Sequence, residues 1–324
     1  MKIDGQTIPE VLKKLAYRLG TKLKERRLEI PPQYGNGYCT GFVFNENIRM
    51  LISNYELEED IMLENSDIDT SKKRLFFKFQ NVFPEIEESG NHITNIPSVL
   101  IGTSRINTDE VVSIHSNTAT ITIEVDAGYL NTLLYVSDRS PVLQSLLQNT
   151  HPLLFEQIID PTLQDIVHEI ISEDTDETFK LFFLRIKAEE LICRLLIELE
   201  IRDEKRLYAL NTQDIETIYK VRKMILEDLA VPPVIADLAV KSGMSATKLK
   251  RLFKQIFGNS IFSYYQEFRM KEAAHLLKEK TYSVSEVGYQ LGFTNLSHFS
   301  KIFMEHMGMK PKQYSMMSQG WVKS

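Results

Sequence analysis

Hydrophobic positions change their spacing along the chain, and the changes mark three stretches. Residues 6–20 carry apolar side chains at the spacing of an amphipathic helix. From about 30 to 125, short β-branched and aromatic runs are separated by Gly, Asn and Pro, which is typical of an antiparallel sheet or barrel. From about 126 onward the spacing is helical again. The pattern predicts an α+β protein in which a β-barrel with flanking helices precedes an all-α region.

The longest helical stretch, from Glu177 to Arg202, is apolar on two sides. One side repeats at the 3-4-3-4 spacing of a short coiled coil, and it consists of Leu181, Leu184, Ala188, Leu191 and Leu195. The second side contains Phe182, Phe183, Ile186 and Ile192. Either the stretch is a core helix on the barrel, or one side packs on the barrel while the other meets a second copy. We expect the second arrangement, a homodimer in which the 3-4-3-4 side forms the dimer helix.

A pattern of small, apolar and glycine positions occurs twice near the C-terminus. Its first part recurs at an offset of 49 residues and its second part at an offset of 50. The matched positions are Ile235/Val284, Leu238/Val287, Ala239/Gly288, Gly243/Gly292, Leu249/Phe299, Leu252/Ile302, Phe253/Phe303, Gly258/Gly308 and Tyr264/Tyr314. The extra residue, between Gly292 and Phe299, lengthens either the second turn or the start of the helix that follows.

Each copy has the order of features of a helix-turn-helix unit. A short amphipathic helix ends near a glycine, which can adopt the left-handed conformation of a tight turn. A second helix follows, with an i, i+3, i+4 apolar stripe. Pro233 suits the first helical position of one copy, and Ser283 with Glu286 predicts a capping box in the other.

Residues 260–280, between the two copies, predict a linker helix. A helix of about 20 residues is about 30 Å long, close to the roughly 34 Å rise of one DNA turn. It could hold two recognition helices against successive major grooves, so that one chain reads two adjacent half-sites. The charge distribution agrees with DNA binding by this region. Residues 212–324 contain 16 Lys and Arg against 10 Asp and Glu, whereas the rest of the chain contains 22 against 34.

These patterns divide the chain into three expected parts. A domain that includes the expected dimer helix covers 1–205, 206–211 form a connector, and 212–324 form a double helix-turn-helix DNA-binding domain. The first part is strand-rich at about 30–125 and helical at about 126–202. No apolar run is long enough to span a membrane, and we expect a cytoplasmic protein with no membrane partner.

The segment "RMKEAAHLL…YSVSEVGYQLGFTNLSHFSKIFMEHMGMKPKQY" resembles the signature of AraC/XylS-type transcription regulators, over about the last hundred residues. The resemblance implies that the C-terminal pair of units reads double-stranded DNA. It also implies that the N-terminal domain senses a ligand, dimerises, or both. A small-molecule effector and RNA polymerase are further expected partners. Met304 and Ser315 stand where the family signature usually has basic residues, so the second unit is expected to grip phosphates less firmly.

The resemblance also implies which side chains face the DNA. In the first unit the expected base-reading residues are Ala246, Thr247, Lys250 and Arg251. In the second unit they are Leu296, Ser297, His298, Ser300 and Lys301. The expected phosphate contacts are Lys241, Lys248, Lys254, Lys310 and Lys312. Because an arginine can bind guanine with two hydrogen bonds, we expect Arg251, and the first unit with it, to carry most of the base specificity.

The strand-rich region resembles the small cupin-like barrel common in these regulators. A ligand pocket inside it would be lined by inward strand residues, for which the candidates are Phe42, Phe44, Leu51, Phe77, Phe79 and Ile101. Metal-binding cupins place two histidines one residue apart ahead of a carboxylate. The sequence contains no such pair, so we expect no metal and no other cofactor.

Two other classes of protein stay open on the sequence alone. One is an enzyme with a cupin-like catalytic domain fused to a DNA-binding module. Against it, the sequence has no recognisable phosphate-binding glycine loop or grouping of a nucleophile with its base. The other is a protein-interaction module built from helical hairpins. The basic run "KSGMSATKLKRLFK" argues against that class, because it points to a polyanionic partner.

Overall fold

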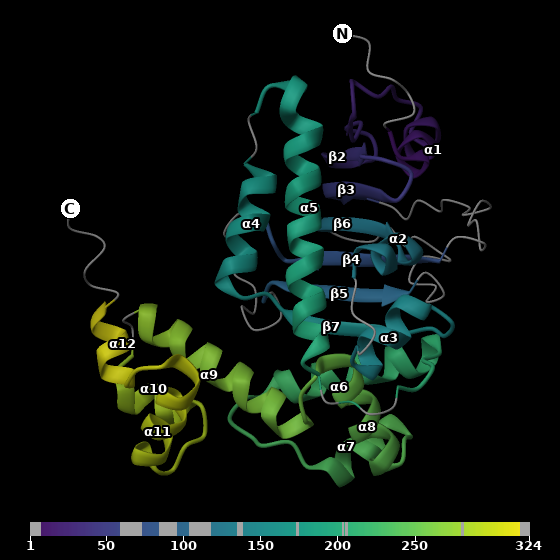
Figure 1. Cartoon of the computed structure of the whole chain (residues 1–324). Helices are drawn as coiled ribbons and strands as arrows, with labels where there is room; N and C mark the ends of the chain where they lie inside the picture. Colours follow the sequence, from purple (N-terminus) through teal and green to yellow (C-terminus); the bar gives the residue numbers. More distant parts are fainter. Residues whose placement is uncertain are drawn as a thin grey trace. The chain divides into compact units, whose positions relative to one another are not determined.

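The computed structural model describes residues 8–58, 73–83, 96–103, 118–134, 139–172, 175–202, 204, 207–279 and 282–317. These residues fall into two compact units, which divide along the chain after Thr212. The first unit contains a β-sheet with helices, and the described part of the second is helical (Figure 1). The predicted α+β class, with an all-α C-terminal region, is confirmed.

An antiparallel sheet forms the centre of the first unit. Its strands are β1 (Arg27–Glu29), β2 (Gly35–Val43), β3 (Ile48–Leu57), β4 (Arg74–Gln80), β5 (Ser98–Thr103), β6 (Thr118–Asp126) and β7 (Leu154–Ile158). They lie in the order β1-β2-β3-β6-β4-β5-β7, so β1 and β7 are the two edges. In the part of the chain that the structure describes, the sheet is therefore open, and the expected closed barrel is not formed.

Five described helices belong to the first unit. They are α1 (Glu10–Arg18), α2 (Ala127–Leu133), α3 (Pro141–Gln148), α4 (Pro161–Ile171) and α5 (Glu177–Glu200). Four of the five begin at a side chain that accepts backbone N–H groups, and α1 begins after Pro9 without such a cap. The side chains of Asp126, Ser140 and Asp160 cap α2, α3 and α4 in this way. Pro141 and Pro161 then occupy first helical positions, where a missing N–H costs no hydrogen bond.

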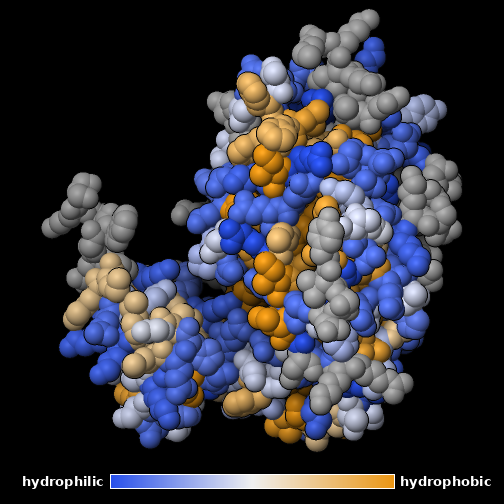
Figure 2. Space-filling model, viewed as in Figure 1, coloured by the Kyte–Doolittle hydropathy of each residue, from blue (hydrophilic) through white to orange (hydrophobic). Residues whose placement is uncertain are grey.

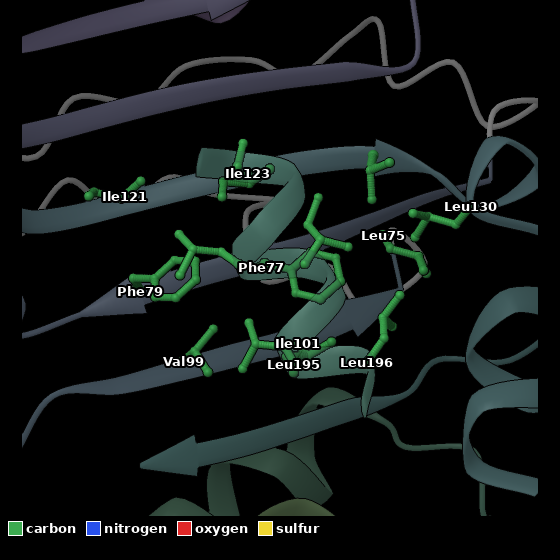
Figure 3. Packing of buried hydrophobic residues seen from close by; sticks show 14 of the residues in the cluster. Leu75, Phe77, Phe79, Val99, Ile101, Ile121, Ile123, Leu130, Leu195 and Leu196 are labelled. Carbon is green, nitrogen blue, oxygen red and sulfur yellow. The ribbon is translucent and has the colours of Figure 1, made fainter. Parts of the chain in front are cut away.

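One face of the sheet is covered by α5, which runs across the strands (Figure 1). Alternate residues of β4 point to this face, and Phe77 lies opposite Ile101 on β5 and Ile123 on β6. Figure 3 shows these side chains packed together with Leu195 and Leu196 of α5. The alternation of buried and half-buried positions along β4 is what period-two side-chain orientation produces when one face is packed.

The expected pocket residues are part of this packing. Phe42, Phe77, Phe79 and Ile101 are at most 2% exposed and belong to the core beneath α5, with Phe44 packed against it. Leu51 packs against a separate cluster that α1 forms with β1–β3. The structure therefore places these six residues in packed clusters, and a ligand pocket among them stays a prediction. With the sheet open, a helix occupies the side where the interior of a barrel was expected.

The predicted dimer helix also faces the core. On α5, the side chains of Leu184, Ala188, Leu191 and Leu195 are buried against the sheet, and Leu181 is half-buried against the same cluster. The prediction that this stripe meets a second copy is wrong, because its side chains already pack on the chain's own sheet. The apolar residues on the outward side of α5 are Phe179, Phe182, Ile186, Cys193, Ile197 and Ile201. Figure 2 shows hydrophobic patches along this helix, with hydrophilic surface between them.

The second unit consists of seven described helices. They are α6 (Thr212–Glu227), α7 (Ile235–Ser242), α8 (Ala246–Phe257), α9 (Ile261–Glu279), α10 (Val284–Gln290), α11 (Leu296–Met307) and α12 (Pro311–Met317). The predicted linker helix is α9. It contacts α8 of the first helix pair, and it contacts α10 and α11 of the second pair together with α12. None of the helices within the described ranges is long and apolar enough to cross a membrane.

Candidate nucleic-acid interface

The repeated glycines end their helices in the left-handed conformation that the sequence predicts. The φ angles are 66° at Gly243 and 75° at Gly258 in the first unit, and 76° at Gly292 and 73° at Gly308 in the second. A non-glycine residue adopts this conformation only at a cost in energy. Both helix pairs, α7–α8 and α10–α11, therefore have a left-handed glycine in the turn and another at the end of the second helix.

The two units also close in the same way. Tyr264 packs edge-on against Phe253 with ring centres 5.3 Å apart, and Tyr314 packs edge-on against Phe303 at 5.4 Å. A cation contacts each tyrosine: Arg222 Nε donates to the Tyr264 hydroxyl at 2.7 Å, and Lys278 Nζ lies 5.6 Å from the Tyr314 ring centre. The sequence repeat is thus a repeat of packing, including its closing tyrosines.

The extra residue of the second unit lies in its turn. Ser245, two residues after the turn glycine, caps α8 by accepting the Lys248 N–H. Asn295, three residues after its glycine, caps α11 by accepting the N–H groups of Ser297 and His298. The longer turn changes where the second recognition helix starts relative to the helix before it.

Helix starts agree with the predictions at one position and differ at another. The capping box of Ser283 and Glu286 is present, and these hydrogen bonds lower the pKa of the Glu286 carboxyl. Pro233 is not at a first helical position, because α7 starts at Ile235 with Val234 as its cap. Val234 offers no side-chain oxygen, so nothing local fixes that start as a polar cap would.

The second unit needs its small residue at the helix crossing. A Cβ atom on Gly288 would lie 2.7 Å from Leu296 Cδ2 and 3.2 Å from Phe299 Cδ1. Leu296 therefore points toward α10 and is half-buried. The side chain of Leu296 thus helps to fill the crossing, and its role in reading bases stays a prediction.

On the first recognition helix, α8, the predicted base-reading residues share one side. Thr247, Lys250 and Arg251 are exposed and Ala246 is half-exposed, while Leu249, Leu252 and Phe253 of the same helix are buried. Two of the predicted phosphate contacts flank this side: Lys241 is exposed on α7, and Lys254 is partly exposed one turn after Lys250. These positions are compatible with a helix whose outer face lies in a groove.

One of the expected phosphate contacts, Lys248, forms an ion pair inside the second unit. Its ammonium donates to the Asp214 carboxylate of α6 at 2.7 Å, and the Asp214 side chain is 14% exposed. The ion pair joins the first recognition helix to the first helix of the second unit. The expected free phosphate contact is therefore replaced by a contact inside the protein.

On the second recognition helix, α11, four predicted residues remain on the outer side. Ser297, His298 and Lys301 are exposed and Ser300 is half-exposed. Lys301 Nζ lies 4.0 Å from the Glu305 carboxylate, a loose pair between well-exposed groups. The predicted phosphate contacts Lys310 and Lys312 are exposed at the start of α12. This outer side carries less positive charge than that of α8.

Comparison with known proteins places the second unit in a family. Residues 238–317 match the family described as "Helix-turn-helix domain". The chain is 32% identical over 108 residues to the HTH-type transcriptional regulator GbdR of Pseudomonas aeruginosa, covering 33% of this chain and 29% of that protein. It is 28% identical over 127 residues to the HTH-type transcriptional activator RhaR of Yersinia pseudotuberculosis, covering 39% and 44%.

A solved structure is similar over the same region. It is a transcriptional regulator with an AraC-type DNA-binding domain from Chromobacterium violaceum, with 26% identity, a TM-score of 0.32, and coverage of 34% of this chain and 99% of that one. Residues 238–317 are a helix-turn-helix domain, as the sequence predicts. The chain spans less than half the length of these two curated relatives.

Three contacts near this surface have no signal in the sequence. They are the Asp214–Lys248 pair, the Arg222–Tyr264 hydrogen bond and a hydrogen bond from Arg269 to the Leu291 carbonyl. The partners are 34, 42 and 22 residues apart, so local periodicity says nothing about them. An unmatched charge beside an apolar stripe, as at Arg269, is the nearest signal that the sequence provides.

Proposed function

We propose that this protein is a sequence-specific DNA-binding transcription regulator whose C-terminal domain reads two adjacent major-groove half-sites. One observation carries the proposal: two helix-turn-helix units of matched geometry stand at the two ends of a single linker helix, α9. With 19 residues, α9 is about 28 Å long, close to the rise of one DNA turn. Because its target would be chromosomal DNA, we propose a cytoplasmic location for the protein.

Within this proposal the first unit reads most of the sequence. Thr247, Lys250 and Arg251 reach base edges, and Arg251 makes the bidentate guanine contact. Lys241 and Lys254 bind phosphates and so fix the position of α8 in the groove. Lys248 serves the packing of α8 on α6, as its pair with Asp214 indicates.

The second unit contributes more to position than to sequence. Ser297, His298, Ser300 and Lys301 can form single hydrogen bonds, and none of them has the paired donors and acceptors that select one base strongly. Lys310 and Lys312 add phosphate contacts. Shape and deformability of the DNA then matter more at this half-site than direct base contacts.

Dimerisation through the outward side of α5 is a further part of the proposal, with a second copy of the chain as the partner. The residues on this side are arranged symmetrically about the bond between Glu189 and Glu190. Four of the six have an apolar counterpart at 379 − i, Ile186 with Cys193 and Phe182 with Ile197, whereas Phe179 and Ile201 would face Glu200 and Thr178. Two antiparallel copies would therefore bring apolar residues against apolar residues around a two-fold axis.

Charges on α5 follow the same symmetry. Arg185 pairs with Glu189 at 3.0 Å, and Arg194 pairs with Glu190 at 2.8 Å, as mirror images about the same point. By the same rule, Arg185 lies opposite Arg194 of the second copy and Glu189 lies opposite Glu190, so like charges face each other, each already paired within its own helix. The apolar pattern, and not these charges, supports a second copy as the partner.

A small-molecule effector acting on the first unit, and RNA polymerase as a partner, complete the proposal by family resemblance. The alternative of a cupin-like enzyme fused to a DNA-binding module has less support, because the comparisons match transcription regulators. We therefore propose a regulator without enzymatic activity.

The experiment that tests the proposal is selection of sheared genomic DNA by the purified full-length protein, followed by sequencing. The expected result is enrichment of paired half-sites about one helical turn apart. The Arg251→Ala variant is the control and is expected to lose the first half-site motif. Enrichment without any shared motif, equal in wild type and variant, would contradict sequence-specific reading.

A further inference from the structure

The middle of α9 is joined to the turn of the second unit by a buried arginine. Arg269, only 6% exposed, donates from Nε to the Leu291 carbonyl at 2.8 Å and also from Nη2. Its guanidinium lies 3.6 Å from the centre of the Phe293 ring. One side chain thus holds the carbonyl that ends α10 and the aromatic residue just after the turn glycine.

One turn earlier on α9, a buried tyrosine contacts the segment that leads into the first unit. The Tyr265 hydroxyl donates to the Leu229 carbonyl at 2.7 Å, in the segment between α6 and α7. Tyr265 is fully buried, and the Arg269 guanidinium lies 5.4 Å from its ring centre. The next residue, Ala230, is fixed by donating its N–H to Asp228 at 2.8 Å.

The two segments held by α9 also touch each other. A Cβ atom built on Gly292 would lie 2.1 Å from the Ala230 carbonyl oxygen, so the backbones of the two segments are in direct contact. Only a residue without a side chain fits there. Tyr265, Arg269, Leu229–Ala230 and Leu291–Phe293 thus form one buried junction.

The junction is placed to control the geometry between the two units. Its segment Leu229–Ala230 leads into α7, and its segment Leu291–Phe293 is the turn between α10 and α11. A hydrogen bond to a buried backbone carbonyl is strongly directional, and losing it leaves the carbonyl unsatisfied. Motion of one recognition helix against the other would break these contacts.

We propose that Tyr265 and Arg269 are positioning residues that fix the spacing between the two half-sites that this chain accepts. The inference rests on the proposed function and adds to it a spacing rule set by contacts that never touch DNA. Inserting one base pair rotates the second half-site by about 34° and moves it by about 3.4 Å. A rigid reader cannot follow that change, whereas a loosened reader can.

The test uses the full-length protein and DNA probes from the genomic selection. One series carries both half-sites at the selected spacing or with one base pair inserted or removed, and another probe carries the first half-site alone. The variants are Tyr265→Phe, which removes only the hydroxyl, and Arg269→Met, which keeps much of the length but none of the donors. Arg222→Met is the matched control, because Arg222 contacts Tyr264 and Phe257 rather than this junction.

Wild type is expected to bind the selected spacing on the order of tenfold more tightly than the altered spacings, because only then do both units engage at once. Tyr265→Phe and Arg269→Met are expected to reduce this ratio severalfold while leaving affinity for the single half-site unchanged. Arg222→Met is expected to keep the wild-type ratio. The readout is thus a ratio of affinities, which general destabilisation of the domain would leave unaltered.

Two results would overturn the inference. One is an unchanged spacing ratio in both junction variants. The other is an equal loss of affinity for every probe, including the single half-site, which would mean that the junction serves stability alone. If wild-type protein bound none of the probes above random DNA, the proposed function itself would fail and this inference with it, so the two failures are distinguishable.

Discussion

Lys248 Nζ on the first recognition helix, α8, donates to the Asp214 carboxylate at 2.7 Å. Asp214 lies on α6, the helix that begins directly after the expected connector. A lysine in this position is within reach of a phosphate if its partner releases it. We therefore expect α6 to compete with DNA for this one positive charge.

Removing the carboxylate charge should strengthen DNA binding. With Asp214→Asn we expect affinity to rise several-fold and the slope of log K against log salt to steepen by about 1, because one more phosphate is neutralised. The measurement is a salt titration of binding to a fixed probe. In a Lys248→Ala background the same substitution should do nothing, and an equal gain in both backgrounds would contradict the competition.

The two units should differ in how they read bases. Arg251→Ala is expected to cost about 1–3 kcal/mol at one position of the first half-site and to relax the preference there. Lys301→Ala should weaken binding almost uniformly across sequences. Competition binding with probes that carry each base at each position measures both effects. A greater loss of base preference in Lys301→Ala would reverse the assignment of the two units.

Much of the second unit could be predicted from sequence because its signals are local or repeated. The capping box of Ser283 and Glu286 spans three residues, and the glycines recur at a fixed offset. Two weak patterns in register constrain each other, which one pattern cannot do. Pro233 failed as a start signal because proline also suits the position before a helix, and here Val234 intervenes.

The first unit was harder to predict because its apolar patterns are ambiguous. Both sides of α5 are apolar, so periodicity indicates two stripes but not which one faces the sheet. Leu191 and Ile186 look equally suited to an interface in the sequence, yet one is buried and the other exposed. Likewise, a strand residue such as Phe77 points inward in a barrel and in an open sheet alike. Contacts such as Arg269 to Leu291 depend on the fold and have no local signature.

Gly292 should be much less tolerant of substitution than Gly308. Their φ angles are nearly equal, 76° and 73°, so Gly→Ala pays the same left-handed cost of about 1–2 kcal/mol at both. A Cβ on Gly292 would also collide with the Ala230 carbonyl, whereas nothing lies within 4 Å of one on Gly308. We expect Gly292→Ala to destabilise the protein by at least about 1 kcal/mol more, as urea unfolding would measure. Equal losses would mean that the junction can open at no cost.

The two cysteines should react very differently with thiol reagents. Burial raises the pKa of the Cys39 thiol to about 12, so folded protein holds almost no thiolate there near neutral pH. Cys193 is exposed on α5. At pH 8 we expect one thiol of the monomer to be alkylated, with mass spectrometry locating it at Cys193, and the second only in denaturant, while the proposed dimer should slow the reaction of Cys193. Because the folded pKa of Cys39 is raised, its contribution to stability is full below about pH 9 and is lost as pH rises toward 12.

The dimer proposed for α5 can be tested by the position of a cross-link. In an antiparallel pair centred between Glu189 and Glu190, residue 186 of one copy faces residue 193 of the other. The two Cys193 residues are then separated by about 10 Å along the helix axis, beyond the reach of a disulfide. Wild type should therefore form no disulfide-linked dimer under mild oxidation, whereas Ile186→Cys should form one, which non-reducing electrophoresis and mass measurement would detect.

Control variants separate this arrangement from others. Cys193→Ser in the Ile186→Cys background should abolish the cross-link, and a linked dimer in wild type would indicate a parallel pair instead. Phe182→Glu should give a folded monomer, because Phe182 is 67% exposed and supports no core. Leu191→Glu should unfold the first unit, since it buries a charge between α5 and the sheet. Sedimentation of wild type as a monomer at every concentration would rule out the dimer.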